Sequence, residues 1–119
     1  MSYKILVVDD SKLVAVMLKD GLQNQGYEVV TALNGKEGLR KITEDSPDLI
    51  ILDVQMPGMT GYEFMHELKK MGGHPLIPVL MLTADETTQE HLPEEGVRGY
   101  LQKPVDISRL VERVEECLR

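Results

Sequence analysis

The sequence alternates between short apolar runs and segments with a helical period of apolar residues, and this alternation constrains the fold more than any other feature. The apolar runs are predicted strands at residues 3–8, 28–32, 48–52, 77–82 and 98–102. The longest intervening segments, and the C-terminal end, are predicted helices. Strictly alternating strands and helices favour a parallel sheet covered by helices on both faces. We therefore predict a doubly wound α/β domain with strand order 2-1-3-4-5.

Polar residues that can cap a helix precede four of the predicted helices, at Ser11, Asn34, Thr60 and Asp106. Thr60 and Glu63 also have the spacing of a capping box. These caps predict that the helices begin directly after the loops that follow the strands.

Four apolar residues of the first predicted helix, over residues 11–25, are available for burial: Leu13, Val16, Met17 and Leu22. The chain has no Trp and one Phe, so we expect these side chains to join an aliphatic core.

The segment from Glu86 to Glu95 is polar and contains Pro93. A proline inside a helix costs about 3 kcal/mol. We expect a short or irregular fourth helix in this segment.

Acidic residues lie where two of the predicted strands end. Asp9 and Asp10 follow the first strand and Asp53 follows the third, while Thr83 and Lys103 follow the fourth and fifth. Ligand sites of doubly wound sheets lie outside the carboxyl ends of the strands, beside strands 1 and 3 in this order. We therefore expect all five side chains to converge on one rim of the sheet.

Three neighbouring carboxylates are electrostatically unfavourable on their own. Two unit charges about 4 Å apart repel by roughly 4 kcal/mol at an effective dielectric constant of 20. Either one carboxyl group keeps its proton or a divalent cation binds. Oxygen ligands without His or Cys favour Mg²⁺, Mn²⁺ or Ca²⁺ over zinc, and few carboxylates on short loops favour Mg²⁺. An aspartate can also accept a phosphoryl group, whose charge Lys103 could neutralise and whose oxygen Thr83 could hydrogen-bond.

At this point the sequence resembles the receiver domain of two-component response regulators, over essentially its whole length. The motifs that carry the resemblance are Asp9-Asp10-Ser11, Ile51-Leu52-Asp53 with Met56-Pro57-Gly58, Leu82-Thr83-Ala84 and Gly99-Tyr100-Leu101-Gln102-Lys103-Pro104. The resemblance implies a single receiver domain over residues 1–119 with a (βα)5 flavodoxin-like three-layer sandwich. It also implies a phosphorylation-dependent signalling switch rather than a separate enzyme.

The resemblance assigns a role to each residue of the rim. Asp53 is the phosphoacceptor, Asp10 binds Mg²⁺ directly, and Asp9 binds it through a metal-bound water. Asp53 and the backbone carbonyl of Gln55 complete the metal ligands, with Mn²⁺ as an alternative to Mg²⁺. Thr83 and Lys103 hold the phosphoryl oxygens.

The resemblance also implies features that concern the conformational switch and the lifetime of the phosphoryl group. Tyr100 is the aromatic switch that moves inward when Thr83 shifts toward the phosphoryl group. The Lys103–Pro104 peptide bond is expected to be cis, which proline permits at low cost. Gln55 and Asp85, two residues after Asp53 and Thr83, tune the lifetime of the phosphoryl group.

The partners that the resemblance implies are a histidine kinase or a histidine phosphotransfer protein and a downstream protein target. The face made of the fourth helix, the fifth strand and the fifth helix reports the change, and a phosphorylation-dependent homodimer is an alternative. The net charge of −7 argues against a direct nucleic-acid surface or an anionic membrane surface. The N-terminus has no signal-peptide pattern, so we expect a cytoplasmic protein, either a stand-alone regulator or part of a longer one.

Three other functions are weighed against the receiver. A flavodoxin-like cofactor module needs a Ser/Thr/Gly-rich phosphate loop after the first strand, where this chain has Asp9 and Asp10. An aspartate-nucleophile phosphohydrolase needs a second Asp at the position of Gln55. A pseudo-receiver that only docks partners is opposed by the presence of every phosphorylation residue.

Overall fold

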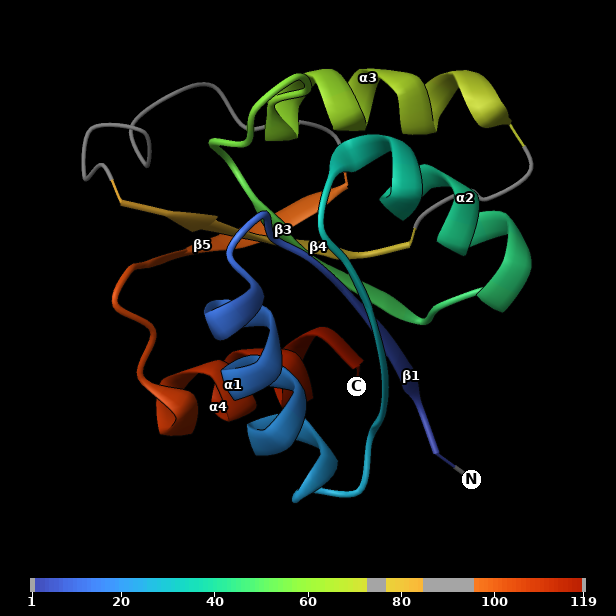
Figure 1. Ribbon diagram of the computed structural model, residues 1–119. Helices are drawn as coiled ribbons and strands as arrows, with labels where there is room; N and C mark the ends of the chain where they lie inside the picture. The colour runs from blue at the N-terminus through green and yellow to red at the C-terminus, as the bar shows by residue number, and fades with distance from the viewer. Residues whose placement is uncertain (1, 73–76, 85–95, 119) are drawn as a thin grey trace.

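The computed structural model describes residues 2–72, 77–84 and 96–118 and shows a parallel five-stranded sheet (Figure 1). The strand order is β2-β1-β3-β4-β5, as the alternation predicts. The strands are β1 (Lys4–Val8), β2 (Glu28–Ala32), β3 (Leu49–Asp53), β4 (Val79–Thr83) and β5 (Val97–Gln102). The predicted strands therefore all exist, with ends that differ by at most two residues.

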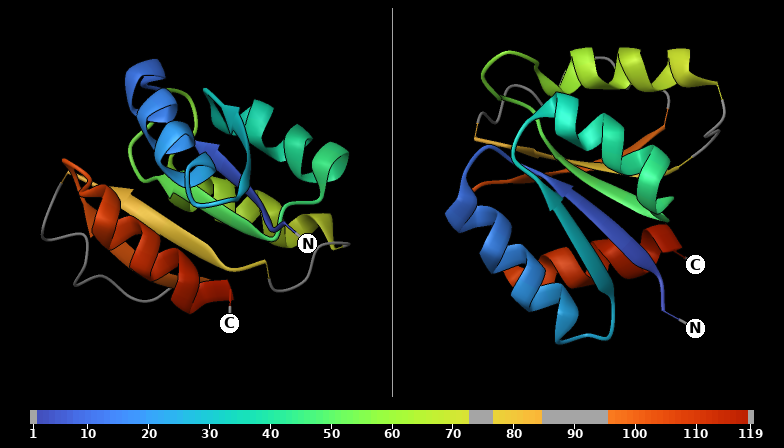
Figure 2. Two further views of the ribbon diagram at one scale, coloured as in Figure 1. Left: turned by 90° about the horizontal axis from the view of Figure 1, so that it is seen from below. Right: turned by 45° about the vertical axis from the view of Figure 1, so that its right-hand side comes forward.

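Helices cover both faces of the sheet and complete a three-layer sandwich. Among the described residues they are α1 (Lys12–Gln23), α2 (Gly35–Asp45), α3 (Gly61–Met71) and α4 (Ile107–Leu118). Figure 2 shows α2 and α3 on one face of the sheet and α1 and α4 on the other. The helix predicted over residues 86–95 lies outside the described residues. No helix in the described part of the chain has the length and apolar character needed to cross a bilayer.

The predicted capping residues begin the helices as expected. The side chains of Ser11, Asn34 and Thr60 accept hydrogen bonds from backbone N–H groups in the first turns of α1, α2 and α3. The capping box is complete, because Thr60 and Glu63 each accept a backbone N–H from the other. Oδ1 of Asp106 accepts from Ser108 N at the start of α4.

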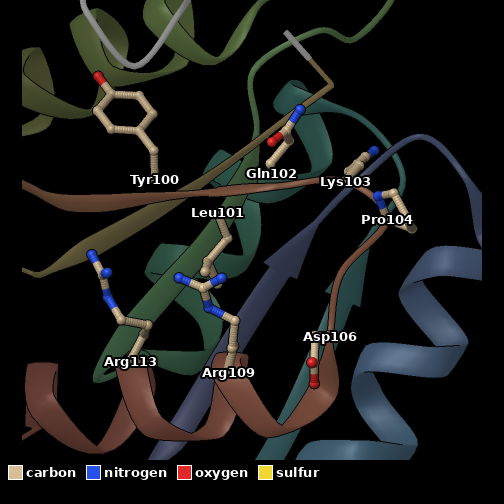
Figure 3. Close-up of a pocket in the computed structure, with 8 residues that line it drawn as sticks. All are labelled: Tyr100, Leu101, Gln102, Lys103, Pro104, Asp106, Arg109 and Arg113. Carbon is tan, nitrogen blue, oxygen red and sulfur yellow. The ribbon is translucent and has the colours of Figure 1, made fainter. Parts of the chain in front are cut away.

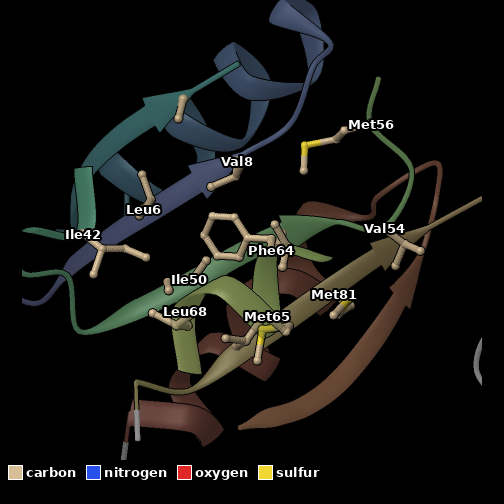
Figure 4. Close-up of a cluster of buried hydrophobic side chains, with 13 residues drawn as sticks. Leu6, Val8, Ile42, Ile50, Val54, Met56, Phe64, Met65, Leu68 and Met81 are labelled. Atoms are coloured by element: carbon tan, nitrogen blue, oxygen red, sulfur yellow. The ribbon is translucent and has the colours of Figure 1, made fainter. Parts of the chain in front are cut away.

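The apolar core is divided by the sheet into two clusters. One cluster lies against α2 and α3, where Figure 4 shows the Phe64 ring among side chains that include Leu6, Val8 and Ile50. The other lies against α1 and α4 and contains alternate residues of the same strands, such as Ile5 and Val7. Strands buried on both faces explain why they appear in the sequence as continuous apolar runs.

The predicted buried face of α1 is wrong for three of its four residues. Leu13, Val16 and Met17 are 70%, 46% and 49% exposed, and only Leu22 is buried. The helix instead buries Ala15 and Leu18 together with Leu22. Both sets have helical spacing, and the second is selected because it meets the sheet and α4 in the cluster on that side.

The register of the sheet brings the ends of four strands together. Val8 pairs with Leu52, Asp53 pairs with Leu82, and Thr83 pairs with Gln102. The residues that follow β1, β3, β4 and β5 therefore lie at one rim, where the sequence predicts the functional site.

Candidate functional site

Three carboxyl groups form the centre of this rim. Carboxylate oxygens of Asp9, Asp10 and Asp53 all lie within 4.8 Å of one another. Asp9 is fully buried and Asp53 is 4% exposed, whereas Asp10 is exposed. The cluster is therefore closed on the side of the core and open to solvent at Asp10.

Backbone hydrogen bonds orient the two buried carboxylates. Asp9 Oδ1 accepts from the N–H of Ser11 at 2.9 Å, and Asp53 Oδ1 accepts from the N–H of Gln55 at 3.2 Å. Asp9 N also donates to Ala32 O at 3.1 Å, which ties the end of β1 to β2. In both residues, Oδ1 of the carboxylate is therefore held by the loop that follows the strand.

Lys103 brings a positive charge to the opposite oxygens. Its Nζ lies 3.0 Å from Asp9 Oδ2 and 3.2 Å from Asp53 Oδ2. The backbone positions this lysine, because Lys103 N donates to Thr83 O at 2.8 Å and so joins the end of β5 to the end of β4. The Lys103–Pro104 peptide bond is cis, as expected from the sequence.

The electrostatics of the cluster raise the pKa of Asp53 to about 6 from an ordinary value of 3.8. Burial is the largest cause and the neighbouring charge of Asp9 adds to it, while Lys103 and the N–H of Gln55 lower the pKa. Burial opposes the charge of Lys103, but the two carboxylates outweigh it and the pKa of Lys103 is raised. A single lysine therefore offsets only part of the repulsion between the carboxylates.

The donor set fits a small divalent cation. The three groups within reach of one another are all carboxylates, and no histidine or cysteine of the described residues joins them. Hard oxygen ligands suit Mg²⁺, Mn²⁺ and Ca²⁺, and a site with only a few of them leaves places for water and phosphate oxygens, as Mg²⁺ prefers. Burial and the charge of Asp9 raise the pKa of Asp53, and a bound cation would favour the ionised form of this carboxyl group.

The remaining predicted residues differ in their burial. Thr83 is fully buried at the end of β4. Tyr100 packs against the hydrophobic core cluster on the α2 and α3 side of the sheet. Its buried hydroxyl has no hydrogen-bond partner among the described residues. Gln55 is exposed beside Asp53, and Asp85 lies outside the described residues. The side chain of Tyr100 points inward, which is the position expected after switching. The movement between an outward and an inward position stays a prediction.

Gly61 contributes to the site in a way that the sequence analysis did not identify. A Cβ at this position would lie 2.9 Å from Asp53 O and 3.0 Å from Val54 Cα. Its N–H donates to Val54 O at 2.8 Å, so α3 begins in direct contact with the backbone of the acidic strand end. The available signal was the position of Gly61 at the end of the turn-forming stretch that begins at Met56. Close approach of two backbone segments requires the absence of a side chain.

Solved structures of similar proteins share this architecture. The chemotaxis response regulator CheY4 of Vibrio cholerae superposes with a TM-score of 0.91 at 36% identity, and the match covers 99% of this chain and 100% of that one. Response regulator TrrA of Thermotoga maritima, in complex with Mg²⁺ and BeF, gives a TM-score of 0.87 at 36% identity over 98% and 99% of the two chains.

Two relatives are transcriptional regulatory proteins about twice as long as this chain. The alkaline phosphatase synthesis transcriptional regulatory protein PhoP of Bacillus subtilis is 40% identical over 100% of this chain and 50% of its own length. The transcriptional regulatory protein PrrA of Mycobacterium tuberculosis is 39% identical over 99% of this chain and 51% of its own. The chain thus spans about half the length of these relatives.

The family model for the response regulator receiver domain matches residues 5–115. This match spans the whole described fold except the first residue of β1 and the last residues of α4. The chain belongs to the response regulator receiver domain family of two-component signalling.

Proposed function

We propose that this chain is a phosphorylation-dependent switch that accepts a phosphoryl group on Asp53. The observation that carries the proposal is that Asp53 lies in one cluster with Asp9 and Asp10 and that Nζ of Lys103 is 3.2 Å from its Oδ2. The donor would be a phosphohistidine of a histidine kinase or a histidine phosphotransfer protein. Residues 1–119 would act as one receiver domain.

In the transfer step, a carboxylate oxygen of Asp53 attacks the phosphorus atom of the phosphohistidine. The new O–P bond forms as the N–P bond breaks, and the electron pair of that bond returns to the imidazole of the donor, which takes up a proton. Asp53 must be ionised to attack, so its raised pKa of about 6 still leaves the reactive form dominant at pH 7. The reaction depends on positioning and charge neutralisation more than on acid–base catalysis.

Asp10, Asp53 and the backbone carbonyl of Gln55 would hold Mg²⁺ directly, and Asp9 would hold it through a water. When bound, the cation supplies positive charge to the carboxylates and to phosphoryl oxygens. Mn²⁺ has the same ligand preferences and is an alternative. The donor set of three carboxylates within 4.8 Å supports this assignment.

Lys103 would neutralise a phosphoryl oxygen, and the hydroxyl of Thr83 would donate a hydrogen bond to another. Lys103 now contacts both Asp9 and Asp53, so it needs no large movement to reach a group attached to Asp53. Hydrolysis would follow by attack of water on phosphorus and return of the O–P electron pair to Asp53. Gln55 and Asp85 would tune this lifetime, so the chain assists reactions of its own side chain rather than turning over a separate substrate.

The output would be a change of the face formed by the segment 86–95, β5 and α4. Movement of Thr83 toward the phosphoryl group would stabilise Tyr100 in its inward position, where it already packs against the core. Such a switch biases an existing equilibrium between two conformations. A downstream protein or a second phosphorylated copy would read this face, and the domain itself would make no contact with nucleic acid or membrane. We propose a cytoplasmic location.

Incubation with acetyl phosphate and Mg²⁺, followed by intact-protein mass measurement, tests the proposal. We expect the addition of one phosphoryl group to the chain and to D20N, which changes an exposed aspartate of α1. We expect no addition to D53N, or to the wild-type chain in the presence of a chelator. Equal modification of D53N, or an unmodified wild-type chain, would contradict the proposal.

A further inference from the structure

A pocket of about 600 Å³ lies between β5 and α4, and Lys103, which contacts the carboxylate cluster, is one of its lining residues (Figure 3). One wall is the stretch of β5 and the following turn from Tyr100 to Pro104. The other wall is α4, through Arg109 and Arg113, with Asp106 at its start. Among the described strands β5 is at the edge of the sheet, so none of them lies beside this wall on its outer side.

Two arginines define the chemistry of the pocket. Arg109 and Arg113 lie four residues apart on α4 and therefore on the same face of the helix. Figure 3 shows both guanidinium groups directed from α4 toward β5. Within the described part of the chain, neither arginine takes part in an ion pair, whereas Arg40 on α2 is paired with Glu44 at 3.5 Å.

Gly99 makes room for one of these groups. A Cβ at this position would overlap the guanidinium of Arg113, so that group lies directly against the backbone of β5. The backbone of Gly99 has no positive φ that would require glycine. The absence of a side chain here therefore serves the placement of Arg113.

Positive charge predominates in the pocket although the chain has a net charge of −7. Lys103 is offset by its two carboxylate partners in the neighbouring cluster. Asp106 is the acidic residue of the lining and offsets part of this charge, while its Oδ1 accepts a hydrogen bond from Ser108 N. Two arginines against one aspartate leave a positive charge for an external anion.

We propose that this pocket binds an acidic segment of a partner protein, with its carboxylates on Arg109 and Arg113. A guanidinium forms paired hydrogen bonds with a carboxylate, which makes arginine suited to such contacts. A short acidic segment needs only these two arginines, whereas a nucleic acid needs an extended basic surface, which the net charge of −7 argues against. The inference deepens the proposed function by naming the partner chemistry of its output face, but the pocket exists without a change at Asp53.

NMR titration of the isotopically labelled full chain with a capped hexaglutamate peptide tests the proposal, with capped hexaglutamine as the matched neutral probe. We expect hexaglutamate to shift the side-chain Nε–H signals of Arg109 and Arg113, and hexaglutamine to leave them unchanged. R109Q and R113Q should each weaken binding by about threefold to tenfold, as for partly exposed charge pairs. R40Q should bind as the wild type does.

G99A separates a built site from general charge attraction, because it keeps every charge and displaces only the guanidinium of Arg113. We expect G99A to weaken hexaglutamate binding while the spectrum stays dispersed. The absence of shifts at both arginines, or equal binding by R113Q, G99A and the wild type, would overturn the proposal. Self-association that R113Q abolishes, detected by sedimentation without peptide, would also overturn it in favour of a second copy. D53N should bind the peptide normally, so failure of phosphorylation at Asp53 leaves this test intact.

Discussion

Nζ of Lys103 lies 3.2 Å from Oδ2 of Asp53, although the two residues are 50 positions apart in the chain. The contact is possible because β5 follows β4 and β4 follows β3 in the sheet, with their carboxyl ends at one rim. The lysine thereby holds down the pKa of a carboxyl group that burial and Asp9 push up.

Removing this ammonium should raise the pKa of Asp53 further. In K103Q the desolvation of Asp53 and the charge of Asp9 remain, while the main opposing charge is lost. We expect the pKa to move above its present value of about 6, measured by carbon-detected NMR titration of the side chain in chelator-treated buffer. K70Q, at an exposed lysine of α3, should leave the pKa unchanged. An unchanged pKa in K103Q would show that the contact has no energetic weight.

Ionised Asp53 should destabilise the metal-free fold. Its pKa is higher in the folded chain than the ordinary 3.8, so the folded state holds more protons between about pH 4 and pH 6. Stability conferred by this group is therefore complete below about pH 4 and falls as the pH rises through about 6. D53N avoids the loss, and we expect it to exceed the wild type by about 1 to 2 kcal/mol at pH 7.

Urea denaturation followed by circular dichroism, at a series of pH values in the presence of a chelator, measures this difference. The gap between D53N and the wild type should open across the window from pH 4 to pH 6 and then stay constant. D20N changes an exposed aspartate of α1 and should show no such gap. A gap that closes as the pH rises would have the wrong sign for a raised pKa.

Magnesium should stabilise the chain by binding only the folded carboxylate cluster. At a free concentration ten times the dissociation constant, the expected gain is about 1.4 kcal/mol in the free energy of unfolding. D10N should lose most of this gain, because it removes one of the three carboxylates while keeping the size of the side chain. D20N, on the opposite end of α1 from the cluster, should keep it. Equal stabilisation of D10N and D20N would place the bound ion elsewhere.

Substitution of Gly61 should disturb the site as well as the fold. In G61A the new Cβ meets Asp53 O and Val54 Cα, which are backbone atoms that cannot rotate away. Overpacking of this kind costs about 1 to 3 kcal/mol. We also expect weaker Mg²⁺ binding, measured by NMR titration, because Asp53 and the loop to Gln55 must shift.

G21A is the matched control for Gly61. Its Cβ would lie 2.9 Å from Ile107 Cγ2, a comparable overlap at the α1–α4 contact and away from the carboxylates. This substitution should lower stability without changing the affinity for Mg²⁺. If both variants bind Mg²⁺ as the wild type does, Gly61 has a packing role alone.

The parts of this structure that could be predicted are those in which local signals agree. The apolar runs end in acid at Asp9 and Asp53, and the parallel topology is enough to bring those ends together. Thr60 and Glu63 define the start of α3 through two hydrogen bonds within a single turn, so the sequence contains all the information needed.

The parts that could not be predicted depend on contacts between distant segments. In α1, the stripe of Leu13, Val16 and Met17 is as apolar as the stripe of Ala15, Leu18 and Leu22, and only packing against β1, β2 and α4 selects between them. The roles of Gly61 and Gly99 follow from backbone and guanidinium groups that reach them from other elements. The positions of these glycines in the sequence do not indicate which group of another element will lie against them.

The division of the core by the sheet has a consequence for how the molecule opens. Leu6 and Val8 belong to the cluster under α2 and α3, whereas Ile5 and Val7 belong to the cluster under α1 and α4. A slip of β1 by one residue would exchange the two sets, and a shift toward one helix layer would withdraw it from the other. The amide protons of β1 and β3 should therefore exchange with solvent through one concerted opening, and loosening of either helix layer should shorten the protection of both strands together.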